Sequence, residues 1–199
     1  MTARQIIAHR LANQRLAGPL FAGPLDVAHH FGAIQAQDYS GAKWAIGQRC
    51  GATDAQVEAF FNTGRILRTH LCRPTWHFVR AEDIRWILHL TASRVHQANA
   101  SMARKRGLDA KLLRRATDII AKALVGGKNL ERDRLMLLLN RARIDTTDNR
   151  SSHFMMYAEL EGVVCSGPRV GRQFTYALLD ERAANARKFD REEALAELT

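Results

Sequence analysis

Apolar residues recur at helical spacing over three stretches near the start of the chain, and polar or glycine-containing segments separate them. Pro24 suits the first turn of the second stretch, and Thr53 followed by Gln56 has the spacing of a capping box at the start of the third. Turn-forming residues after Gln37 should end the second helix. The pattern therefore predicts helices over residues 2–16, 24–37 and 53–64.

The pattern then changes to that of strands. Residues 66–79 are rich in β-branched and aromatic side chains, and Arg73-Pro74 divides them, so they predict two short strands joined by a turn. Three helices followed by a hairpin is the arrangement of a winged helix, a variant of the helix-turn-helix.

A similar order of elements follows a predicted helix over residues 82–94, a basic helical connector and a break at Gly126-Gly127. Leucines on one side predict a helix over residues 130–143, and Ser151 or Ser152 can cap a further helix. Two strand-like segments then flank a loop with the glycines and proline of a hairpin tip, over residues 163–165, 167–171 and 173–178. We therefore predict a mainly α fold with small β-hairpins, the wings, in tandem winged helix-turn-helix units.

The predicted organisation has four parts. A first winged-helix unit with a trailing helix occupies residues 1–100, the connector 101–128, and a second winged-helix unit 129–185. Residues 186–199 begin a helix that should lead into a further C-terminal part. No apolar run has the length needed to cross a bilayer, so we expect no membrane partner and a cytoplasmic protein, nucleoid-associated when bound to DNA.

Positive charge is the strongest feature of the composition. The formal net charge is +10, and residues 101–150 alone carry 13 Lys and Arg against six Asp and Glu. Such a balance favours double-stranded DNA as the partner, although a single basic residue is more often part of a solvated face. The candidate DNA contacts are the basic cluster and the arginines near the two hairpin tips: Arg104, Lys105, Arg106, Arg73, Arg169 and Arg172.

The cysteines and tryptophans are predicted to be structural. The three cysteines are far apart and fit neither a disulfide framework nor a metal-ligand spacing, so we expect core positions for them. We predict no metal ion and no cofactor. Trp44, Trp76 and Trp86 each lie within an apolar pattern, which favours core packing over base stacking.

Several motifs resemble those of the AlkZ/YcaQ-like winged-helix DNA glycosylases. They are the segment from Gly32 to Arg49, Arg68-Thr-His70, Pro74-Thr-Trp-His77 and Gly167-Pro168. The resemblance covers essentially the whole chain, is most specific in the first segment, and implies a longer protein with several winged-helix units. It also implies a catalytic Gln-aliphatic-Gln or Gln-aliphatic-Asp motif, which falls on Gln35 and Gln37 around the small Ala36.

The chemistry of such a reaction suits two amides. A purine alkylated at N7 is already cationic and leaves as a neutral base, so the enzyme mainly positions a water and stabilises the charge that develops on the sugar. On an unbroken helix Gln35 and Gln37 would lie roughly 200° apart, so we expect them where a helix ends. Asp38 could instead activate the water, and His70 could contact DNA or act as an accessory residue, although a structural role is favoured for His70.

The sequence leaves three functions open. The first is a monofunctional, monomeric DNA glycosylase acting on N7-alkylated, bulky or crosslinked purines. The second is a non-catalytic winged-helix DNA-binding protein or transcriptional regulator, usually a symmetric dimer. The third and weakest is a scaffold for protein interactions, which would not bind DNA.

Overall fold

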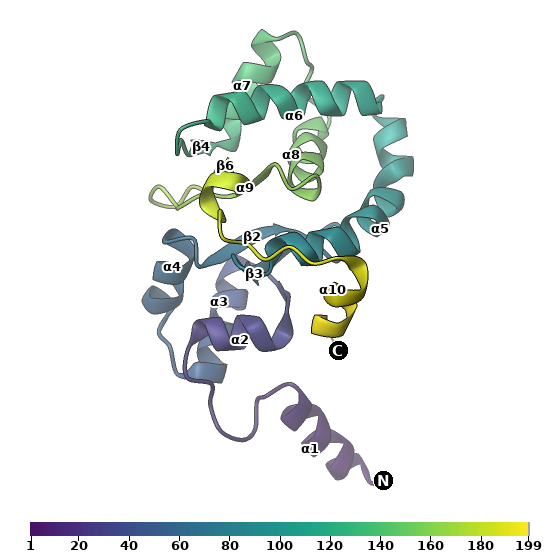
Figure 1. The fold of residues 1–199 in the computed structure, drawn as a ribbon. Coiled ribbons are helices and arrows are strands. Elements are labelled where there is room, and N and C mark those ends of the chain that lie inside the picture. The colour runs from purple at the N-terminus through teal and green to yellow at the C-terminus, as the bar shows by residue number, and fades with distance from the viewer. Residues whose placement is uncertain (199) are drawn as a thin grey trace.

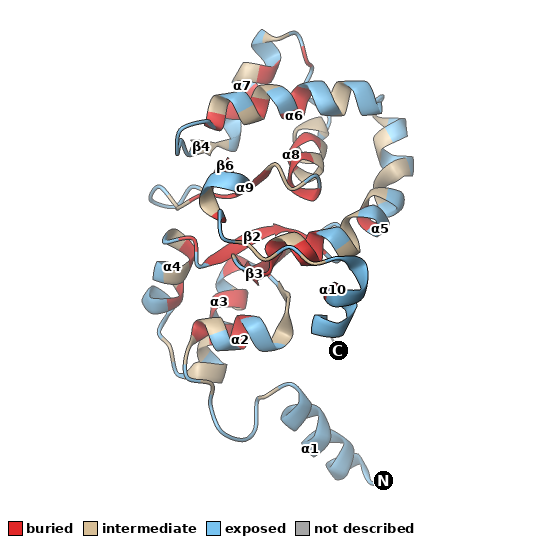
Figure 2. Cartoon of the chain, viewed as in Figure 1, coloured by how far each residue is buried: buried red, intermediate tan, exposed pale blue. Residues whose placement is uncertain are grey.

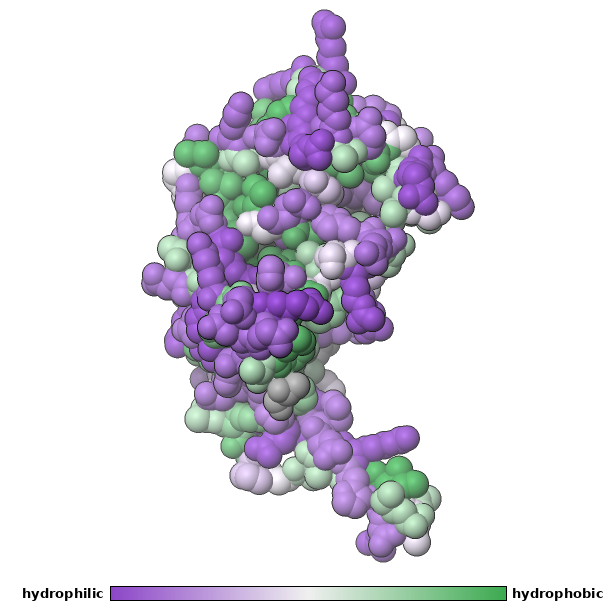
Figure 3. Space-filling view, turned by 45° about the vertical axis from the view of Figure 1, so that its right-hand side comes forward, coloured by the Kyte–Doolittle hydropathy of each residue, from purple (hydrophilic) through white to green (hydrophobic). Residues whose placement is uncertain are grey.

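The computed structural model describes residues 1–198, which form two helical lobes, one above the other in Figure 1. Helix α1 (Ala3–Asn13) extends away from the lower lobe and buries none of its residues. Ile7 of this helix is 57% exposed. Figure 3 shows solvent-exposed apolar side chains at the lower right, where α1 lies.

The lower lobe is the first winged-helix unit. Its elements follow in the order α2 (Pro24–Phe31), β1 (Ile34–Gln35), α3 (Tyr39–Cys50), α4 (Asp54–Asn62), β2 (Ile66–His70) and β3 (Trp76–Arg80). The three strands form an antiparallel sheet in the order β1-β3-β2. Val27, Ile46, Phe61 and Phe78 are fully buried between the three helices and one face of this sheet.

The upper lobe repeats the same order. After α5 (Ile84–Lys105) come α6 (Ala110–Leu124), β4 (Leu130–Glu131), α7 (Arg132–Arg141), α8 (Arg150–Leu160), β5 (Val164–Ser166) and β6 (Thr175–Leu178). The strand order β4-β6-β5 matches that of the first sheet. The short helices α9 (Leu179–Arg182) and α10 (Arg191–Leu198) follow. The mainly α fold with two small hairpins, built as tandem winged-helix units, is confirmed.

A third group of buried side chains joins the two lobes. Leu67 and Val79, on the second face of the first sheet, pack with Ile87 of α5, and Leu160 and Leu179 of the upper lobe belong to the same cluster. Figure 2 shows these buried segments as a red layer across the middle of the molecule. The two units are therefore joined by apolar packing as well as by the long helix α5.

The prediction for residues 24–41 was wrong in two ways. Helix α2 ends at Phe31, because Gly32 takes a positive φ of 63°, and a strand follows. The predicted turn after Gln37 is the start of α3, which the sequence analysis missed. The glycines in α3 allow close contacts: a Cβ on Gly41 would lie 2.6 Å from Asp38 Oδ2, and one on Gly47 2.6 Å from the Ala52 carbonyl oxygen.

Three further boundaries differ from the predictions. The helix predicted over residues 82–94 continues to Lys105 as one helix of 22 residues. The helix predicted over residues 130–143 begins with strand β4, which pairs with β6. Asn149 precedes α8 in the capping position, not Ser151 or Ser152.

Two expectations about buried side chains also need correction. Trp44 is 67% exposed on α3, whereas Trp86 is buried as predicted. The three cysteines are free thiols, but only Cys165 is buried, and Cys72 lies exposed in the first hairpin turn. Burial raises the pKa of the Cys165 thiol to about 12, so the thiol is protonated at neutral pH.

Candidate DNA-binding and catalytic cleft

The Gln35–Ala36–Gln37 segment is extended. Gln35 pairs with His77 across the β1–β3 ladder, and the Ala36 N–H donates to the Trp76 carbonyl at 2.8 Å. Ala36 is fully buried whereas Gln35 and Gln37 are exposed, which is the alternation of a strand. Strand β1 ends at Gln35, and Gln37 lies in the bend before α3, where its Oε1 accepts a hydrogen bond from the Trp76 N–H at 3.4 Å. Extended backbone and a bend, rather than a helix end, therefore present the two amides.

The side chain of Arg68 in β2 is hydrogen-bonded to the backbone of this segment. Its Nε donates to the Ala36 carbonyl at 3.0 Å, and the guanidinium carbon lies 4.3 Å from the ring centroid of Trp76 and 4.7 Å from that of Phe174. Arg68 is only 8% exposed, and burial lowers its pKa below the ordinary value. The sequence analysis did not identify Arg68 as a site residue, although a charged residue within the strand Ile66–His70 was a signal.

His70 is a buried residue next to Trp76 in the same sheet. Its Nδ1 is bonded to the carboxylate of Glu159 from α8, and its ring centroid lies 4.7 Å from that of Trp76. Glu159 is fully buried, and its Oε1 has no hydrogen-bond partner in the described structure. The His70–Glu159 pair therefore ties the first sheet to a helix of the second unit.

Asp38 is the N-cap of α3. Its Oδ1 accepts a hydrogen bond from the Gly41 N–H at 3.1 Å, which satisfies one of the free N–H groups at the helix start. The side chain is exposed, and it directly follows Gln37. The structure thus gives Asp38 a structural task at the edge of the site.

Two adjoining hollows lie between the first sheet and the second unit. One, of about 310 Å³, is lined by Gln37, His70, Trp76, Arg132 and Tyr176, among others. The other, of about 210 Å³, shares Trp76, Arg132 and Tyr176 with the first. We refer to the two together as the cleft. It brings Gln37 and His70 together and places the exposed Arg132 at the start of α7 beside them.

The predicted DNA contacts fall into two groups. Four side chains are exposed: Arg73, Arg104, Lys105 and Arg172. Arg106 is half-buried, and its guanidinium donates to the Asp148 carbonyl.

Arg169, at the tip of the second hairpin, is turned inward. Its backbone N–H donates to Asn62 Oδ1 at 2.9 Å, and its guanidinium donates to the Arg172 carbonyl at 2.7 Å. The guanidinium also lies 3.5 Å from a carboxylate oxygen of Glu58 and stacks over Tyr39 at 5.1 Å. The hairpin of the second unit is therefore bound to α4 of the first unit through Arg169.

The third helix of each unit, which enters the groove in many helix-turn-helix proteins, lacks a basic exposed face here. Helix α4 contains no Lys or Arg, and its Asp54 and Glu58 form ion pairs with Lys43. Helix α8 buries Phe154 and Glu159 and packs against the first unit. The cleft and its basic surroundings are thus a better candidate for DNA contact than either helix.

Neither a metal site nor a membrane segment is found in the part of the chain that the structure describes. Within residues 1–198, no three His, Cys, Asp or Glu side chains lie close enough together to hold a metal ion. None of the described helices has both the length and the apolar character needed to span a bilayer.

Two repeats of the winged-helix order on one basic chain, with a polar cleft between them, define a tandem winged-helix protein. The chain belongs to the AlkZ-like DNA glycosylase family, whose model matches residues 28–199. Its fold is similar to that of the DNA glycosylase AlkZ of Streptomyces sahachiroi, with a TM-score of 0.81 at 23% sequence identity. The similarity covers 100% of this chain and 55% of AlkZ, so the chain spans about half the length of that protein. No curated protein matches the sequence.

Proposed function

We propose that this protein hydrolyses the N-glycosidic bond of N7-alkylated purines in double-stranded DNA, bulky or crosslinked adducts included. The observation that carries the proposal is the Gln35–Ala36–Gln37 segment, which pairs with β3 and places Gln37 in the lining of the cleft. Membership of a DNA glycosylase family supports it.

The two glutamines would act by positioning. Each amide offers an oxygen acceptor and an NH₂ donor, so the pair can hold a water against the anomeric carbon without changing protonation state. Arg68 fixes the backbone between them through the Ala36 carbonyl. A cationic leaving base needs little acid catalysis, which agrees with a site that depends on amides.

The reaction should be monofunctional. A lyase step needs an amine to form a Schiff base with the sugar, and no lysine is among the described residues that line the cleft. Lys43, the nearest lysine in sequence to Gln37, is 5% exposed and paired with Asp54 and Glu58. We propose that the chain binds DNA as a monomer through Arg73, Arg104, Lys105 and Arg172.

The decisive experiment is release of free base from duplex DNA containing N7-methylguanine. We expect Gln35→Ala and Gln37→Ala to lower the single-turnover rate about 100-fold while DNA affinity stays unchanged, because each removes a group that orients the water. Gln48→Ala is the matched control, since Gln48 is an exposed glutamine on α3. An unchanged single-turnover rate of base release in both variants would contradict the assignment of the two glutamines as catalytic residues.

The same experiment separates the alternative function. A non-catalytic DNA-binding protein would bind the duplex through the same positive charge but release no base from any adduct. Its affinity would fall steeply with salt in either case, so base release and not binding decides between the two.

A further inference from the structure

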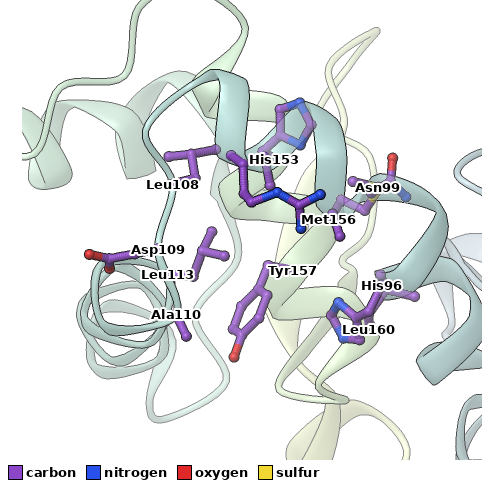
Figure 4. Close-up of a pocket in the computed structure, with 13 residues that line it drawn as sticks. His96, Asn99, Leu108, Asp109, Ala110, Leu113, His153, Met156, Tyr157 and Leu160 are labelled. Atoms are coloured by element: carbon purple, nitrogen blue, oxygen red, sulfur yellow. The ribbon is translucent and has the colours of Figure 1, made fainter.

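A second cavity, of about 370 Å³, lies between α5, the start of α6 and α8. Figure 4 shows its walls: Ala110 and Leu113 of α6 on one side, His96 and Asn99 of α5 on the other, and Tyr157 of α8 between them. We call it the α5–α8 cavity. Its volume lies in the range of about 300–1,000 Å³ that is typical of sites for organic ligands.

The walls of this cavity are mainly apolar. Ala100, Ala103, Leu108, Leu113 and Met156 contribute aliphatic surface. The ring of Tyr157 lies 5.3 Å from that of His96. Flat rings beside aliphatic walls suit an apolar, planar group.

Most polar groups of the cavity are neutral or already paired. His96 Nε2 lies 2.9 Å from a carboxylate oxygen of Glu161, although not in hydrogen-bonding geometry. Burial lowers the pKa of His153, which favours its neutral form. The charged Arg104 and Asp109 also line the cavity, but both are exposed. A strongly charged ligand would therefore find no buried partner of opposite charge among the described residues.

The cavity adjoins the cleft. Asn99, His153 and Met156 line both the α5–α8 cavity and the hollow that contains Gln37. A group bound in one space can thus extend past these three side chains into the other.

We propose that the α5–α8 cavity receives the aromatic part of an alkylating group while the modified nucleotide lies in the cleft beside Gln37. This inference rests on the proposed function for the placement of the nucleotide. It makes the cavity a specificity subsite, which distinguishes bulky aromatic adducts from small ones without taking part in the chemistry.

The test uses two duplexes, one with N7-methylguanine and one with N7-benzylguanine, and a substitution that fills the cavity. Ala100 is half-buried on α5 and lines the cavity, whereas Ala98 on the same helix is exposed and is not among the lining residues. We expect Ala100→Phe to lower kcat/KM for the benzyl adduct at least about tenfold and to change that for the methyl adduct less than twofold. Ala98→Phe should leave both unchanged.

A second variant guards against a folding defect. Ala110 is exposed at the start of α6 and lines the opposite wall, so Ala110→Phe should narrow the cavity without disturbing a core. It should reproduce the selective loss, and thermal unfolding should show both variants folded. An equal loss on both adducts, or no loss in either variant, would overturn the subsite.

A binding measurement separates this inference from the proposed function. Duplexes with a 2′-fluorinated sugar resist base loss, so the affinity for benzylated, methylated and plain guanine can be measured without catalysis. A preference for the benzyl adduct that Ala100→Phe abolishes supports the subsite even if no base is ever released, in which case only the proposed reaction fails. Equal affinity of the unmutated protein for the three duplexes would overturn the subsite directly.

Discussion

At the scale of single residues, the candidate site depends on one buried arginine that holds a piece of extended backbone. Arg68 combines a hydrogen bond to the Ala36 carbonyl with stacking between Trp76 and Phe174. A planar guanidinium can do both at once, whereas the ammonium of a lysine offers neither a flat face nor a fixed direction for its hydrogen bonds. We therefore propose that Arg68 positions the backbone between Gln35 and Gln37.

This role predicts a selective defect in Arg68→Lys. We expect the single-turnover rate of base release to fall about tenfold, because small displacements of catalytic groups cost rate, while the Kd for DNA changes little. Arg65→Lys, at an exposed position just before β2, is the control. Unchanged rates in Arg68→Lys would show that the Ala36 backbone holds its position without the guanidinium.

The sequence predicted the two glutamines but not the way they are presented. Their identity came from a resemblance in a contiguous segment, which one sequence can reveal. The extended conformation at Gln35 depends on pairing with β3, some 40 residues later, and the support from Arg68 depends on a contact across 32 residues. The local pattern of apolar and polar residues does not predict such long-range contacts. For the same reason, the sequence did not predict the buried pair of His70 and Glu159, which are 89 residues apart.

At the scale of elements, the hairpins and the capped helix α4 were predictable because their signals are local. Thr53 and Gln56 form the expected capping box, and the strands of both hairpins lie where the β-branched residues predicted them. Helix α3 was missed because the residues from Asp38 to Gly41 were read as a turn, whereas Asp38 caps the helix and Gly41 allows the close contact with it. Strand β4 has only two residues and forms by pairing with β6.

The start of α5 gives a test of pH dependence. Asp83 is buried, and although burial by itself would raise its pKa, hydrogen bonds from Arg187 and Trp86 and the charge of Arg80 hold the pKa below the ordinary 3.8. A lowered folded-state pKa stabilises the protein above pH 3.8, and this contribution is lost as the pH falls through the lowered value.

We therefore expect Asp83→Asn to lower the free energy of unfolding by about 1–3 kcal/mol at pH 7, because a charge-assisted hydrogen bond is lost. The difference from the unmutated protein should shrink steadily in acid. Urea unfolding at several pH values checks this, with Asp118→Asn on the exposed side of α6 as the control. A difference that stays constant from pH 7 to strong acid would contradict the assignment.

At the scale of the whole molecule, polar links reinforce the apolar layer between the lobes. Arg182, at the end of α9, donates to the carbonyls of Phe61 and Asn62 at the end of α4, at 3.0 and 2.9 Å, and to that of Ser166 in β5 at 3.1 Å. Burial lowers the pKa of Arg182 below its ordinary value. One side chain thus satisfies carbonyls of both units.

This connection predicts a single cooperative unfolding transition. All three tryptophans precede α6, so their fluorescence reports on the first unit and α5, whereas far-ultraviolet circular dichroism reports on every helix. The two signals should coincide during urea unfolding, and Arg182→Ala should lower the midpoint by an amount equivalent to about 2 kcal/mol. Two separate transitions in the unmutated protein would mean that the lobes are independent.

The packing also bears on where the second unit begins. Ala116, Ile120 and Leu124 of α6 lie in the same core cluster as Leu135 of α7 and Phe154 of α8. We propose that α6 is the first helix of this unit, so that the unit begins within the segment predicted as a connector over residues 101–128. The sequence could not show this, because the apolar face of α6 has the same periodicity whichever lobe it covers.

The repeated order of elements makes the second unit an internal copy against which the first can be compared. In the second unit α7 starts directly after β4, whereas in the first unit residues 36–38 separate β1 from α3. Those three residues include Gln37 and the cap Asp38, for which the second unit has no residues between β4 and α7. The longer strand-to-helix junction therefore distinguishes the first unit from the second: it supplies Gln37 and Asp38, for which the second unit leaves no room.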